Sequence, residues 1–188
     1  MPPKAKFTKE EIIEAAFSLV KTEGIEALTS RELGSYLGSS ARPIFTVFKS
    51  MEEVQQAVME AAKTLYKKYV DKGLRQEHPF KGVGMQYILF SVEEPKLFQL
   101  LFMTEQKLRP NLSGVLPLIE ESYQEILLSI QNEYDISESL AKRLYHHLWI
   151  YTHGIATLCA TQMCYFTEDQ LSSMLSEVFL SILKRMKE

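Results

Sequence analysis

The stretch from Thr29 to Val54 constrains the fold more than any other part of the chain, because it spaces helix-starting, small and turn residues at short intervals. Thr29 is followed three residues later by Glu32, a pairing in which a hydroxyl and a carboxylate cap the start of a helix reciprocally. Gly38 follows the last apolar residue of that helix, where a left-handed backbone ends a helix at little cost. The pattern predicts a short helix over about residues 30–37 and then a tight turn.

A second short helix is predicted over about residues 40–48. Ser40 is placed to cap it, and residues 41–43 form its first turn, where Pro43 is tolerated because those N–H groups have no partner within the helix. Gly34 is small at the point where the two helices of a helix-turn-helix come closest. Such a motif presents its second helix to the major groove of DNA. The alternative is a plain helical hairpin inside a core.

The segment from Phe7 to Val58 resembles the DNA-binding domain of the tetracycline-repressor (TetR) family. The matching residues are the end of an amphipathic first helix at Glu23-Gly24, then Ala27-Leu28-Thr29, Arg31-Glu32-Leu33, Gly38, Ser40, Phe45, Phe48 and Ser50 through Val54. Phe45 and Met51 stand where the family usually has tyrosine and lysine. The resemblance implies a protein that binds a palindromic double-stranded DNA operator as a homodimer.

Arg42 is the predicted base reader of this domain, because an arginine fork suits the two acceptors of guanine in the major groove. Phosphate contacts are expected from four other residues, Thr29, Ser30, Thr46 and Lys49. The complete predicted DNA-binding set is Thr29, Ser30, Ser39, Ser40, Ala41, Arg42, Pro43, Phe45, Thr46 and Lys49.

The charge distribution gives modest support to DNA binding. The chain has a net charge of −3, but residues 1–51 carry 7 lysine and arginine residues against 6 aspartate and glutamate residues, a net of +1. Lys4 and Lys6 join Arg42 and Lys49 beside the predicted DNA surface. The acidic residues of this part can lie on the first helix, away from DNA.

The sequence predicts an all-α protein of two domains. Residues 1–51 form the predicted helix-turn-helix domain and residues 52–188 a helical ligand-binding and dimerisation domain. Nine helices are expected, over about 8–23, 30–37, 40–48, 51–75, 83–94, 95–103, 115–133, 136–164 and from 168 onward, with a break over 76–82 and a loop around 107–113. Capping boxes are expected at Thr8 with Glu11, Ser50 with Glu53, Asp135 with Glu138, and Thr167 with Gln170.

Composition limits the remaining classes of protein. Apolar residues make up 46% of the 188 residues, enough for a core. No apolar run approaches the ~18 residues of a membrane span, and the N-terminal segment lacks the apolar stretch of a signal peptide, so a cytoplasmic protein without membrane contact is expected. Cys159 and Cys164 are expected to be free thiols.

The last two helices suit a dimer interface of four helices formed with a second copy of the chain. The predicted dimerisation residues are Leu171, Leu175, Val178, Phe179 and Ile182, and Phe179→Glu is expected to give a monomer. The alternative is that this stripe belongs to the core of a single chain. The segment from Trp149 to Leu158, with His153-Gly154 inside it, resembles the tryptophan…histidine-glycine motif of one class of TetR-family C-terminal domains.

The middle helices are rich in aromatic side chains, which together suit a mainly apolar pocket with a few polar anchors. The predicted ligand-binding residues are Tyr87, Phe90, Phe98, Phe102, Tyr123, Trp149 and His153. In the TetR family this region binds a small molecule that moves the long helix, here residues 51–75. The resemblance therefore implies an apolar or amphipathic effector.

The sequence contains no recognisable catalytic motif and no complete set of metal ligands. His146 and His153 are seven residues apart and share a helix face, but no carboxylate or cysteine on that helix completes a metal site. No nucleophile motif or phosphate-binding glycine loop is present. The sequence therefore predicts neither an enzyme nor a cofactor.

These observations predict a ligand-responsive, homodimeric transcription regulator of the repressor type. The alternative is a helical small-molecule-binding protein that has lost specific DNA recognition, given Phe45, Met51 and the weak basic charge. A helical enzyme is the third class considered, and it lacks catalytic residues.

Overall fold

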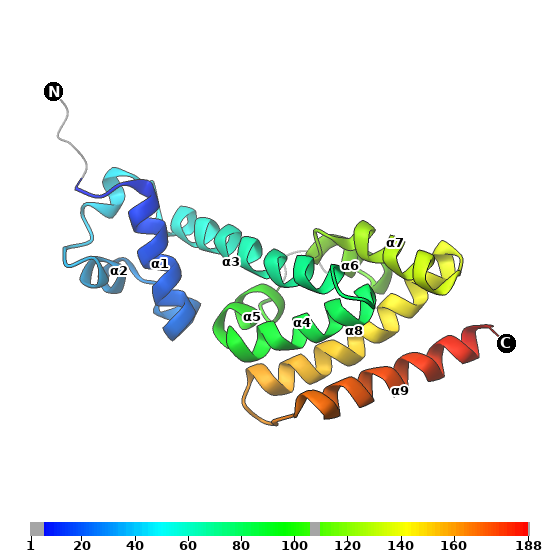
Figure 1. Cartoon of the computed structure of the whole chain (residues 1–188). Helices are drawn as coiled ribbons and strands as arrows, with labels where there is room; N and C mark the ends of the chain where they lie inside the picture. The colour runs from blue at the N-terminus through cyan, green and yellow to red at the C-terminus, as the bar shows by residue number, and fades with distance from the viewer. Residues whose placement is uncertain (1–5, 106–109, 188) are drawn as a thin grey trace. The chain divides into compact units, whose positions relative to one another are not determined.

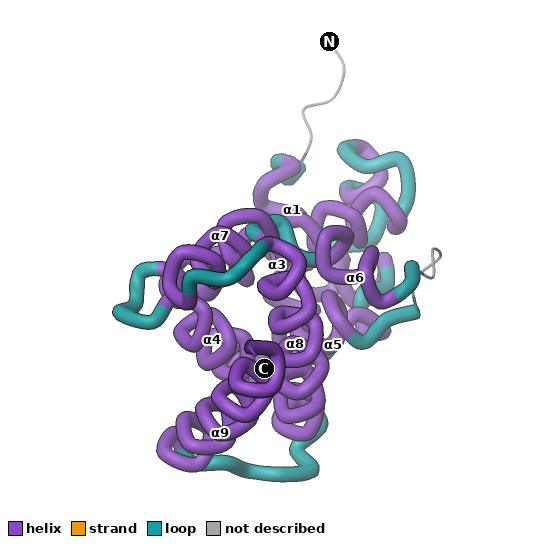
Figure 2. The backbone as a smooth tube through the Cα atoms, turned by 90° about the vertical axis from the view of Figure 1, so that its right-hand side faces the viewer, coloured by secondary structure: helices purple, strands orange, loops and turns teal. Residues whose placement is uncertain are grey.

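The computed structural model describes residues 6–105 and 110–187, and in this part of the chain it contains helices, turns and loops but no strand (Figure 2). The predicted all-α class is confirmed. By its internal contacts the chain separates into two compact units. Unit 1 runs to Leu65 and includes Lys96–Thr104, whereas unit 2 comprises Tyr66–Pro95 and the chain from Glu105 onward.

Nine α-helices are present in the described residues, as labelled in Figure 1. The helices that contribute to unit 1 are α1 (Lys9–Glu23), α2 (Ser30–Tyr36), the first part of α3 (Met51–Leu74) and α5 (Pro95–Phe102). Unit 2 holds the rest of α3 and then α4 (Pro79–Glu93), α6 (Leu112–Ile119), α7 (Tyr123–Tyr134), α8 (Glu138–Ala160) and α9 (Glu168–Lys187). Short 3-10 turns lie at Ile25–Ala27 and Ile44–Thr46.

Two of the predicted capping boxes are confirmed. At the start of α1 the Thr8 hydroxyl accepts from the Glu11 N–H (3.1 Å), and the Glu11 carboxylate accepts from the Thr8 N–H (2.7 Å). Thr167 and Gln170 exchange the same pair of hydrogen bonds before α9. Such caps satisfy N–H groups that a helix start leaves without partners, so they can be read from sequence alone.

Two other predicted caps differ. Before α3 the Glu53 carboxylate accepts from the N–H of Lys49 (2.8 Å), one residue earlier than the cap expected at Ser50. The cap expected at Asp135 is wrong, because Asp135 has a left-handed backbone (φ 49°) that ends α7, and Ser137 accepts from the Leu140 N–H to start α8. Aspartate tolerates the left-handed region better than most residues, so it serves here to end a helix.

The single helix predicted over residues 115–133 is instead two helices, α6 and α7. The α6 helix continues past Pro117, since the Glu120 N–H donates to the Leu116 carbonyl oxygen (2.9 Å), and it ends where Glu120 adopts an extended backbone (φ −115°, ψ 104°). The α8 helix likewise ends at Ala160 rather than near Cys164. Residues 106–109 of the predicted loop, and Lys4, lie outside the described residues.

Unit 2 is built around α4, which packs against α7, α8 and α9, while α8 also packs against α6, α7 and α9. Figure 1 shows α8 and α9 running in opposite directions from the turn that joins them. Phe90, Ile88, Ile126 and Leu144 are completely buried here. Burial of each such side chain contributes about 1.5–3 kcal/mol, and α4 is apolar on most of its surface because it is covered on several sides.

Candidate functional site

The α2 helix of unit 1 touches the chain that follows it through backbone atoms. A Cβ atom added to Gly34 would lie 2.9 Å from the Ala41 nitrogen and 2.9 Å from the Ser40 carbonyl carbon. Gly38 supplies the sharp turn between them with a left-handed backbone (φ 63°). The expected left-handed turn at Gly38 is confirmed, whereas Gly34 packs against the chain at Ser40 and Ala41 rather than against a second α-helix.

The predicted second helix of the motif is not an α-helix. Residues 41–43 form a turn, and only Ile44–Thr46 form a 3-10 helix, with Pro43 rather than Ser40 at its start and no side-chain cap. Arg42 precedes a proline, and that position is sterically disfavoured in the helical region. A start at Ser40 is therefore disfavoured, and the short helix that follows Pro43 ends at Thr46.

The predicted DNA-binding residues nevertheless lie on or near the surface of unit 1. Thr29, Ser40, Arg42, Phe45, Thr46 and Lys49 are exposed, while Ser30, Ser39, Ala41 and Pro43 are half-buried. Several of the hydroxyl groups already have partners within the chain. The Thr29 hydroxyl accepts from the Glu32 N–H (3.1 Å), and the Thr46 hydroxyl donates to the Pro43 carbonyl oxygen (2.6 Å).

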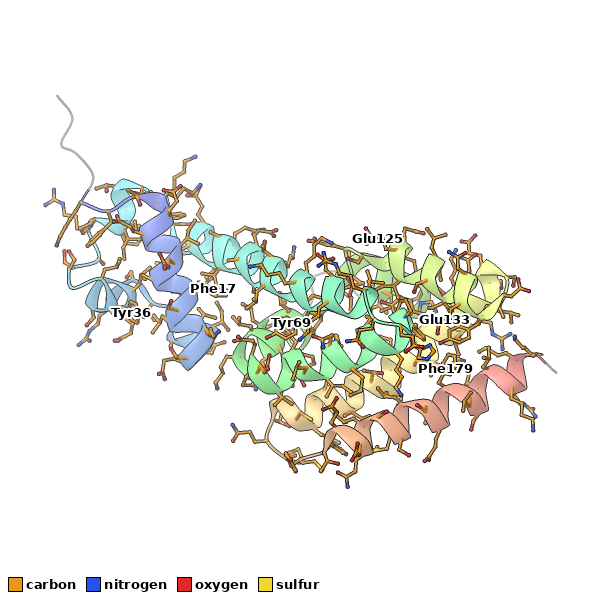
Figure 3. All side chains as sticks on the ribbon, in the orientation of Figure 1. Phe17, Tyr36, Tyr69, Glu125, Glu133 and Phe179 are labelled. Carbon is orange, nitrogen blue, oxygen red and sulfur yellow. The ribbon has the colours of Figure 1, made fainter. Side chains whose placement is uncertain are left out.

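Two residues at this surface were not singled out as direct contacts by the sequence. The Lys6 ammonium donates to the Ser39 hydroxyl (3.0 Å), which brings a positive charge to the turn. Tyr36, at the end of α2, is 55% exposed and is labelled in Figure 3. The sequence could have indicated the exposure of Tyr36. Apart from Leu37, the residues that follow it are glycine and serine, which offer no apolar surface to cover its ring.

Unit 2 contains a cavity of about 260 Å³ with a mainly apolar wall. Its lining includes seven large aromatic side chains, Tyr66, Phe80, Tyr87, Tyr134, Tyr145, Trp149 and Phe179. Rings follow one another along the wall: the centroid of Phe80 lies 5.5 Å from that of Tyr145, and the centroid of Tyr134 lies 4.7 Å from that of Phe179. A concave, aromatic-lined space with few polar groups is the usual form of a small-molecule site.

Only part of the predicted ligand-binding set lies at this cavity. Tyr87 and Trp149 line it, and His153 contacts both of them. Phe90 is completely buried against the rings of Tyr66 and Tyr69.

Three other members of the predicted set lie elsewhere. Tyr123 stacks on Tyr145 but does not line the cavity. Phe98 and Phe102 contact each other in unit 1 and do not line this cavity, so the structure does not bring them together with Tyr87 and Trp149. In sequence, an aromatic residue of the core has the same spacing as one that faces a cavity.

A hydrogen-bonded chain of three side chains crosses one wall of the cavity. The Trp149 indole donates to the Tyr87 oxygen, and the Tyr87 oxygen lies 2.9 Å from Nδ1 of His153. Indole can only donate, so with the histidine proton on Nε2 the Tyr87 hydroxyl accepts from Trp149 and donates to Nδ1. Burial lowers the pKa of His153 and raises that of Tyr87, so both are neutral near pH 7.

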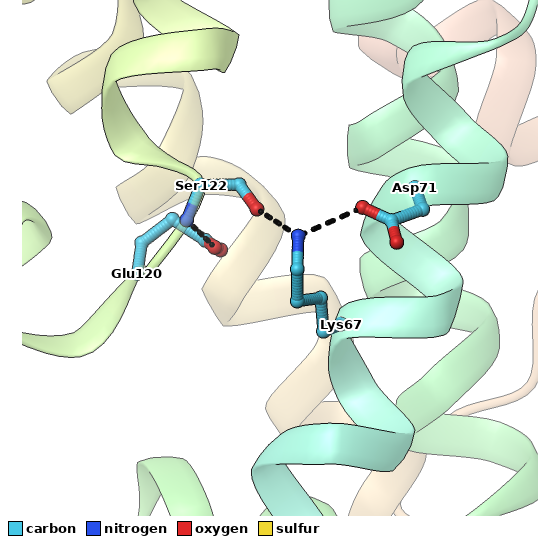
Figure 4. Close-up of polar contacts among 4 residues, drawn as sticks. All are labelled: Lys67, Asp71, Glu120 and Ser122. Atoms are coloured by element: carbon cyan, nitrogen blue, oxygen red, sulfur yellow. Dashed lines mark hydrogen bonds and ion pairs between the residues drawn. The ribbon is translucent and has the colours of Figure 1, made fainter.

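A buried carboxyl group, Glu120, stands at another part of the wall. Its Oε2 accepts from the Tyr66 hydroxyl (2.7 Å) and its Oε1 from the Ser122 N–H (3.0 Å). Lys67 reaches the Ser122 hydroxyl (3.3 Å) and also pairs with Asp71 (3.0 Å), as Figure 4 shows. Burial raises the pKa of Glu120, although both hydrogen bonds oppose that shift.

A second carboxylate, Glu133, lies at the other end of α7. Its Oε1 accepts from the Tyr134 hydroxyl (2.8 Å) and lies 2.8 Å from Nδ1 of His78. Its Oε2 is buried and has no hydrogen-bond partner. Glu133 and Phe179, labelled in Figure 3, reach the cavity from α7 and α9.

The sequence could have indicated some of these lining residues but not others. Tyr145 and Thr152 lie four residues before and three residues after Trp149, so they share its helix face. Glu120 and Glu133 resemble ordinary surface charges in sequence. Their position on the wall depends on the break after α6 and on the packing of α7, which no local pattern specifies.

The stripe predicted for dimerisation divides between two environments. Leu171 and Leu175 are buried by the chain itself, and Leu175 and Phe179 line the cavity. Leu171 and Leu175 are therefore not available to a partner, whereas Phe179 is only half-buried. Val178 and Ile182 are partly exposed. Phe179→Glu would bury a carboxylate in the cavity of its own chain.

Comparison with known proteins shows the fold and no more. No family model matches the sequence. No curated protein matches it either. The crystal structure of superantigen PfiT is similar to this chain with a TM-score of 0.57 at 18% sequence identity, over 95% of this chain and 97% of that chain. At that identity the likeness shows a shared helical fold alone.

Two further properties of the described residues bear on the site. None of their helices combines the length and apolarity needed to span a bilayer. No three His, Cys, Asp or Glu side chains among them lie close enough together to hold a metal ion.

Proposed function

We propose that this protein is a homodimeric, ligand-responsive DNA-binding transcription regulator of the repressor type, resembling the TetR family. In this proposal unit 1 binds a palindromic operator in the cytoplasm and the cavity of unit 2 binds a small amphipathic effector. The observation that carries the proposal is the close backbone approach at Gly34, which joins α2 to the turn in the manner required by the sequence pattern of residues 27–54.

The exposed side chains around that turn support a DNA contact. Arg42 and Lys49 are exposed and the Lys6 ammonium lies at Ser39, so three cations belong to or contact the segment 39–49. Cations beside a turn neutralise phosphates, which supplies most of the sequence-independent affinity of DNA-binding proteins. Arg42 remains the side chain best suited to a guanine edge.

The α3 helix supplies a route by which ligand and DNA binding could be coupled. Its first part belongs to unit 1, and Tyr66, farther along the same helix, lines the cavity of unit 2. A ligand that contacts Tyr66 acts on a continuous helix whose other end starts beside the turn segment. Such a ligand alters DNA binding only if it prefers one arrangement of the two parts over another.

A dimer contact is supported by the outer face of α8. His147, Ile150, Gly154 and Leu158 recur at helical spacing and are all exposed. Two apolar side chains flanking a glycine allow a second helix to approach closely. In a two-fold dimer the same face of each chain meets its copy, and two DNA-binding units can then span two half-sites.

The deciding experiment is DNA selection from a random pool followed by gel-shift titration at several salt concentrations. The proposal expects a palindromic sequence to be enriched. Arg42→Ala should lose the preference for one guanine in each half-site, whereas Lys49→Ala should weaken all sequences similarly and flatten the salt slope by about one unit. Arg75→Ala, an exposed arginine of unit 2, is the control and should bind as the unaltered protein does. Failure to enrich any sequence would overturn the proposal.

A second candidate is a helical small-molecule-binding protein without specific DNA recognition. It is favoured by the 3-10 geometry of Ile44–Thr46, because one short turn offers fewer side chains to a groove than an α-helix does. The same selection distinguishes the two candidates, since the second expects ligand binding with no enriched DNA sequence.

A further inference from the structure

The hydroxyl groups on the wall of the unit 2 cavity divide into those with a partner in the chain and those without. Four of them are already hydrogen-bonded, those of Tyr66, Tyr87, Tyr134 and Ser176. The hydroxyls of Tyr145 and Thr152 also belong to the wall, and among the described residues neither has a hydrogen-bond partner. These two groups are the ones that a ligand could use.

Both of these hydroxyls are enclosed by the protein and yet open to the cavity. Tyr145 and Thr152 are each 5% exposed. A buried polar atom without a partner is either sealed in the interior, as Oε2 of Glu133 is, or in contact with a cavity. The sealed atoms of the described residues do not include the Tyr145 or Thr152 oxygen, so both oxygens face the space that these residues line.

Water alone is a poor occupant of this space. The cavity of about 260 Å³ has seven large aromatic side chains in its wall, whereas a bound water needs about two to four polar partners. The Tyr145 ring itself lies against the rings of Tyr123 and Phe80, with centroids 5.6 and 5.5 Å away. A mainly apolar molecule gains from burial against such rings and needs a polar group only at the hydroxyls.

The charged side chains of the wall favour a neutral ligand. Both oxygens of Glu120 accept hydrogen bonds, and Glu133 has one oxygen with two partners and one that is sealed. The Lys81 ammonium donates to the Ser172 hydroxyl (2.8 Å), which does not belong to the wall. An ion in the cavity would therefore lose its hydration without an opposite charge directed at it, which is costly.

Tyr145 is the better donor of the two open hydroxyls. A phenol is more acidic than an aliphatic alcohol, so its O–H donates more strongly and its oxygen accepts more weakly. Burial raises the pKa of Tyr145, which keeps the proton on the oxygen. The hydroxyl of a helical threonine such as Thr152 can instead turn to the carbonyl oxygen four residues earlier. The group best matched to Tyr145 is a neutral acceptor, such as a carbonyl oxygen.

We propose that the cavity of unit 2 binds a neutral, mainly apolar carbonyl compound, whose carbonyl oxygen accepts a hydrogen bond from the Tyr145 hydroxyl on α8. This inference names the ligand class of the cavity and rests on the ligand-sensing part of the proposed function. Ligand binding is measured without DNA, so the two proposals can fail separately.

The test uses four probes that share a 2-phenylethyl group: 4-phenyl-2-butanone, 2-methyl-4-phenyl-1-butene, 3-phenylpropanoate and 3-phenylpropylamine. The second is a hydrocarbon in which a CH₂ group replaces the ketone oxygen, and the last two are ions at pH 7. Binding to the purified full-length protein is measured by calorimetry and by the fluorescence of Trp149, the only tryptophan of the chain and a residue of the cavity wall. The ketone should bind at least about ten-fold more tightly than either ion.

The Tyr145→Phe variant isolates the hydrogen bond, because it removes the hydroxyl and keeps the ring. It should weaken ketone binding about five- to ten-fold, the effect of one net hydrogen bond, and leave hydrocarbon binding within about two-fold. Each probe is compared between the two proteins, so the different hydrophobicities of the probes cancel. Tyr151→Phe is the matched control, because Tyr151 lies on the same helix and does not line the cavity. It should leave the affinity for both probes unchanged.

The stability of the ligand-free protein gives an independent readout. Tyr145→Phe should leave the midpoint of urea denaturation unchanged, since the hydroxyl has no partner to lose among the described residues. Tyr66→Phe should lower the midpoint, because Glu120 would lose a hydrogen-bond donor. A comparable fall in both variants would show that the Tyr145 hydroxyl is already bonded within the chain, and the proposal would then be wrong.

Three binding results would also overturn the proposal: no binding of the ketone to the unaltered protein, binding of either ion as tightly as the ketone, or equal loss of ketone and hydrocarbon affinity in Tyr145→Phe. Weakened ketone binding in Thr152→Val, with Tyr145→Phe unaffected, would assign the acceptor to the other hydroxyl and contradict the role of Tyr145. Ketone binding that depends on Tyr145, combined with no enriched DNA sequence, would support the ligand class and overturn only the regulatory proposal.

Discussion

The Tyr87 oxygen lies 2.9 Å from Nδ1 of His153, and Trp149 donates to the same oxygen from one turn earlier on the helix that carries His153. This arrangement ties α4 to α8 at the cavity wall. Each donor and acceptor is used only if His153 is neutral and protonated at Nε2. The pH dependence of stability should report on the burial of His153 at this contact.

Burial lowers the pKa of His153 below its unfolded value of about 6.5. Below that pH the unfolded chain binds a proton that the folded chain does not, so the free energy of unfolding should fall as pH decreases from about 6.5 toward the lower folded-state pKa. His153→Gln should make this fall less steep. Urea denaturation of both proteins between pH 7.5 and 5 measures the difference.

Tyr87→Phe is the matched comparison for that experiment. It removes the hydroxyl and should cost about 1 kcal/mol at pH 7 through the lost hydrogen bonds. It retains the burial of His153, which is the cause of the lowered pKa, so the acid-induced fall should remain. Parallel pH curves for the unaltered protein and His153→Gln would contradict the assignment.

The backbone contact at Gly34 yields a second prediction. An alanine there would bring its Cβ 2.9 Å from backbone atoms of residues 40 and 41, which cannot move aside as a side-chain end can. Gly34→Ala should therefore destabilise unit 1 by about 1–3 kcal/mol. Ser35→Ala, at an exposed position of the same helix, should change stability by less than about 0.5 kcal/mol. Hydrogen exchange of the amides of α1 and α2 measures both effects, and equal protection in the two variants would refute the close contact.

Glu120 yields a third prediction with the opposite sign. Burial raises the pKa of Glu120, so between its unfolded and folded values the folded chain holds more protons than the unfolded chain. The free energy of unfolding should therefore fall as pH rises from about 4.5 through the folded-state pKa. Glu120→Gln should flatten this fall and be no less stable than the unaltered protein at pH 7. Glu125→Gln, at an exposed position, should retain the fall. Thermal melts over that pH range measure it, and a steeper fall in Glu120→Gln would contradict the stated cause.

The parts of the fold that the sequence predicts are those decided by neighbours along the chain. The caps at Thr8 and Thr167 and the turn at Gly38 each involve residues within four positions, so the sequence contains the whole interaction. The start of α3 at Met51 follows for the same reason. The prediction of an α-helix over residues 40–48 was wrong because of a local rule. Pro43 disfavours the helical backbone conformation at Arg42, the residue before it.

The cavity is different because its wall is assembled from distant segments. Tyr66, Glu120 and Phe179 are separated by more than fifty residues each and meet only after five helices have packed. Aromatic composition predicted that a pocket could exist, but not which rings would face it. Phe98 and Tyr87 are both aromatic residues within apolar helical segments, so the sequence does not distinguish them. Their positions in separate units are decided by tertiary packing.

The oligomeric state yields the last prediction, which moves the expected interface from the buried part of α9 to the outer face of α8. Ile150 is 48% exposed, so Ile150→Glu should barely affect the stability of an isolated chain. In a dimer formed through this face the new carboxylate would be buried without a partner, at a cost of several kcal/mol, and the dimer should dissociate. Light scattering across a concentration series measures this.

The matched control for the dimer is Leu128→Glu on α7, where the leucine is 55% exposed and lies off the proposed face. It should leave the dimer intact. Gly154→Ala adds a second test, because it should affect the stability of a monomer and the stability of a dimer in opposite directions. A Cβ atom at this position meets nothing within 4 Å in the same chain. Alanine should therefore stabilise a monomer by about 1 kcal/mol through its helix propensity, whereas a helix packed closely against Gly154 in a dimer would be pushed away. A dimer that survives Ile150→Glu, or one that Gly154→Ala strengthens, would show that the chains associate through another surface.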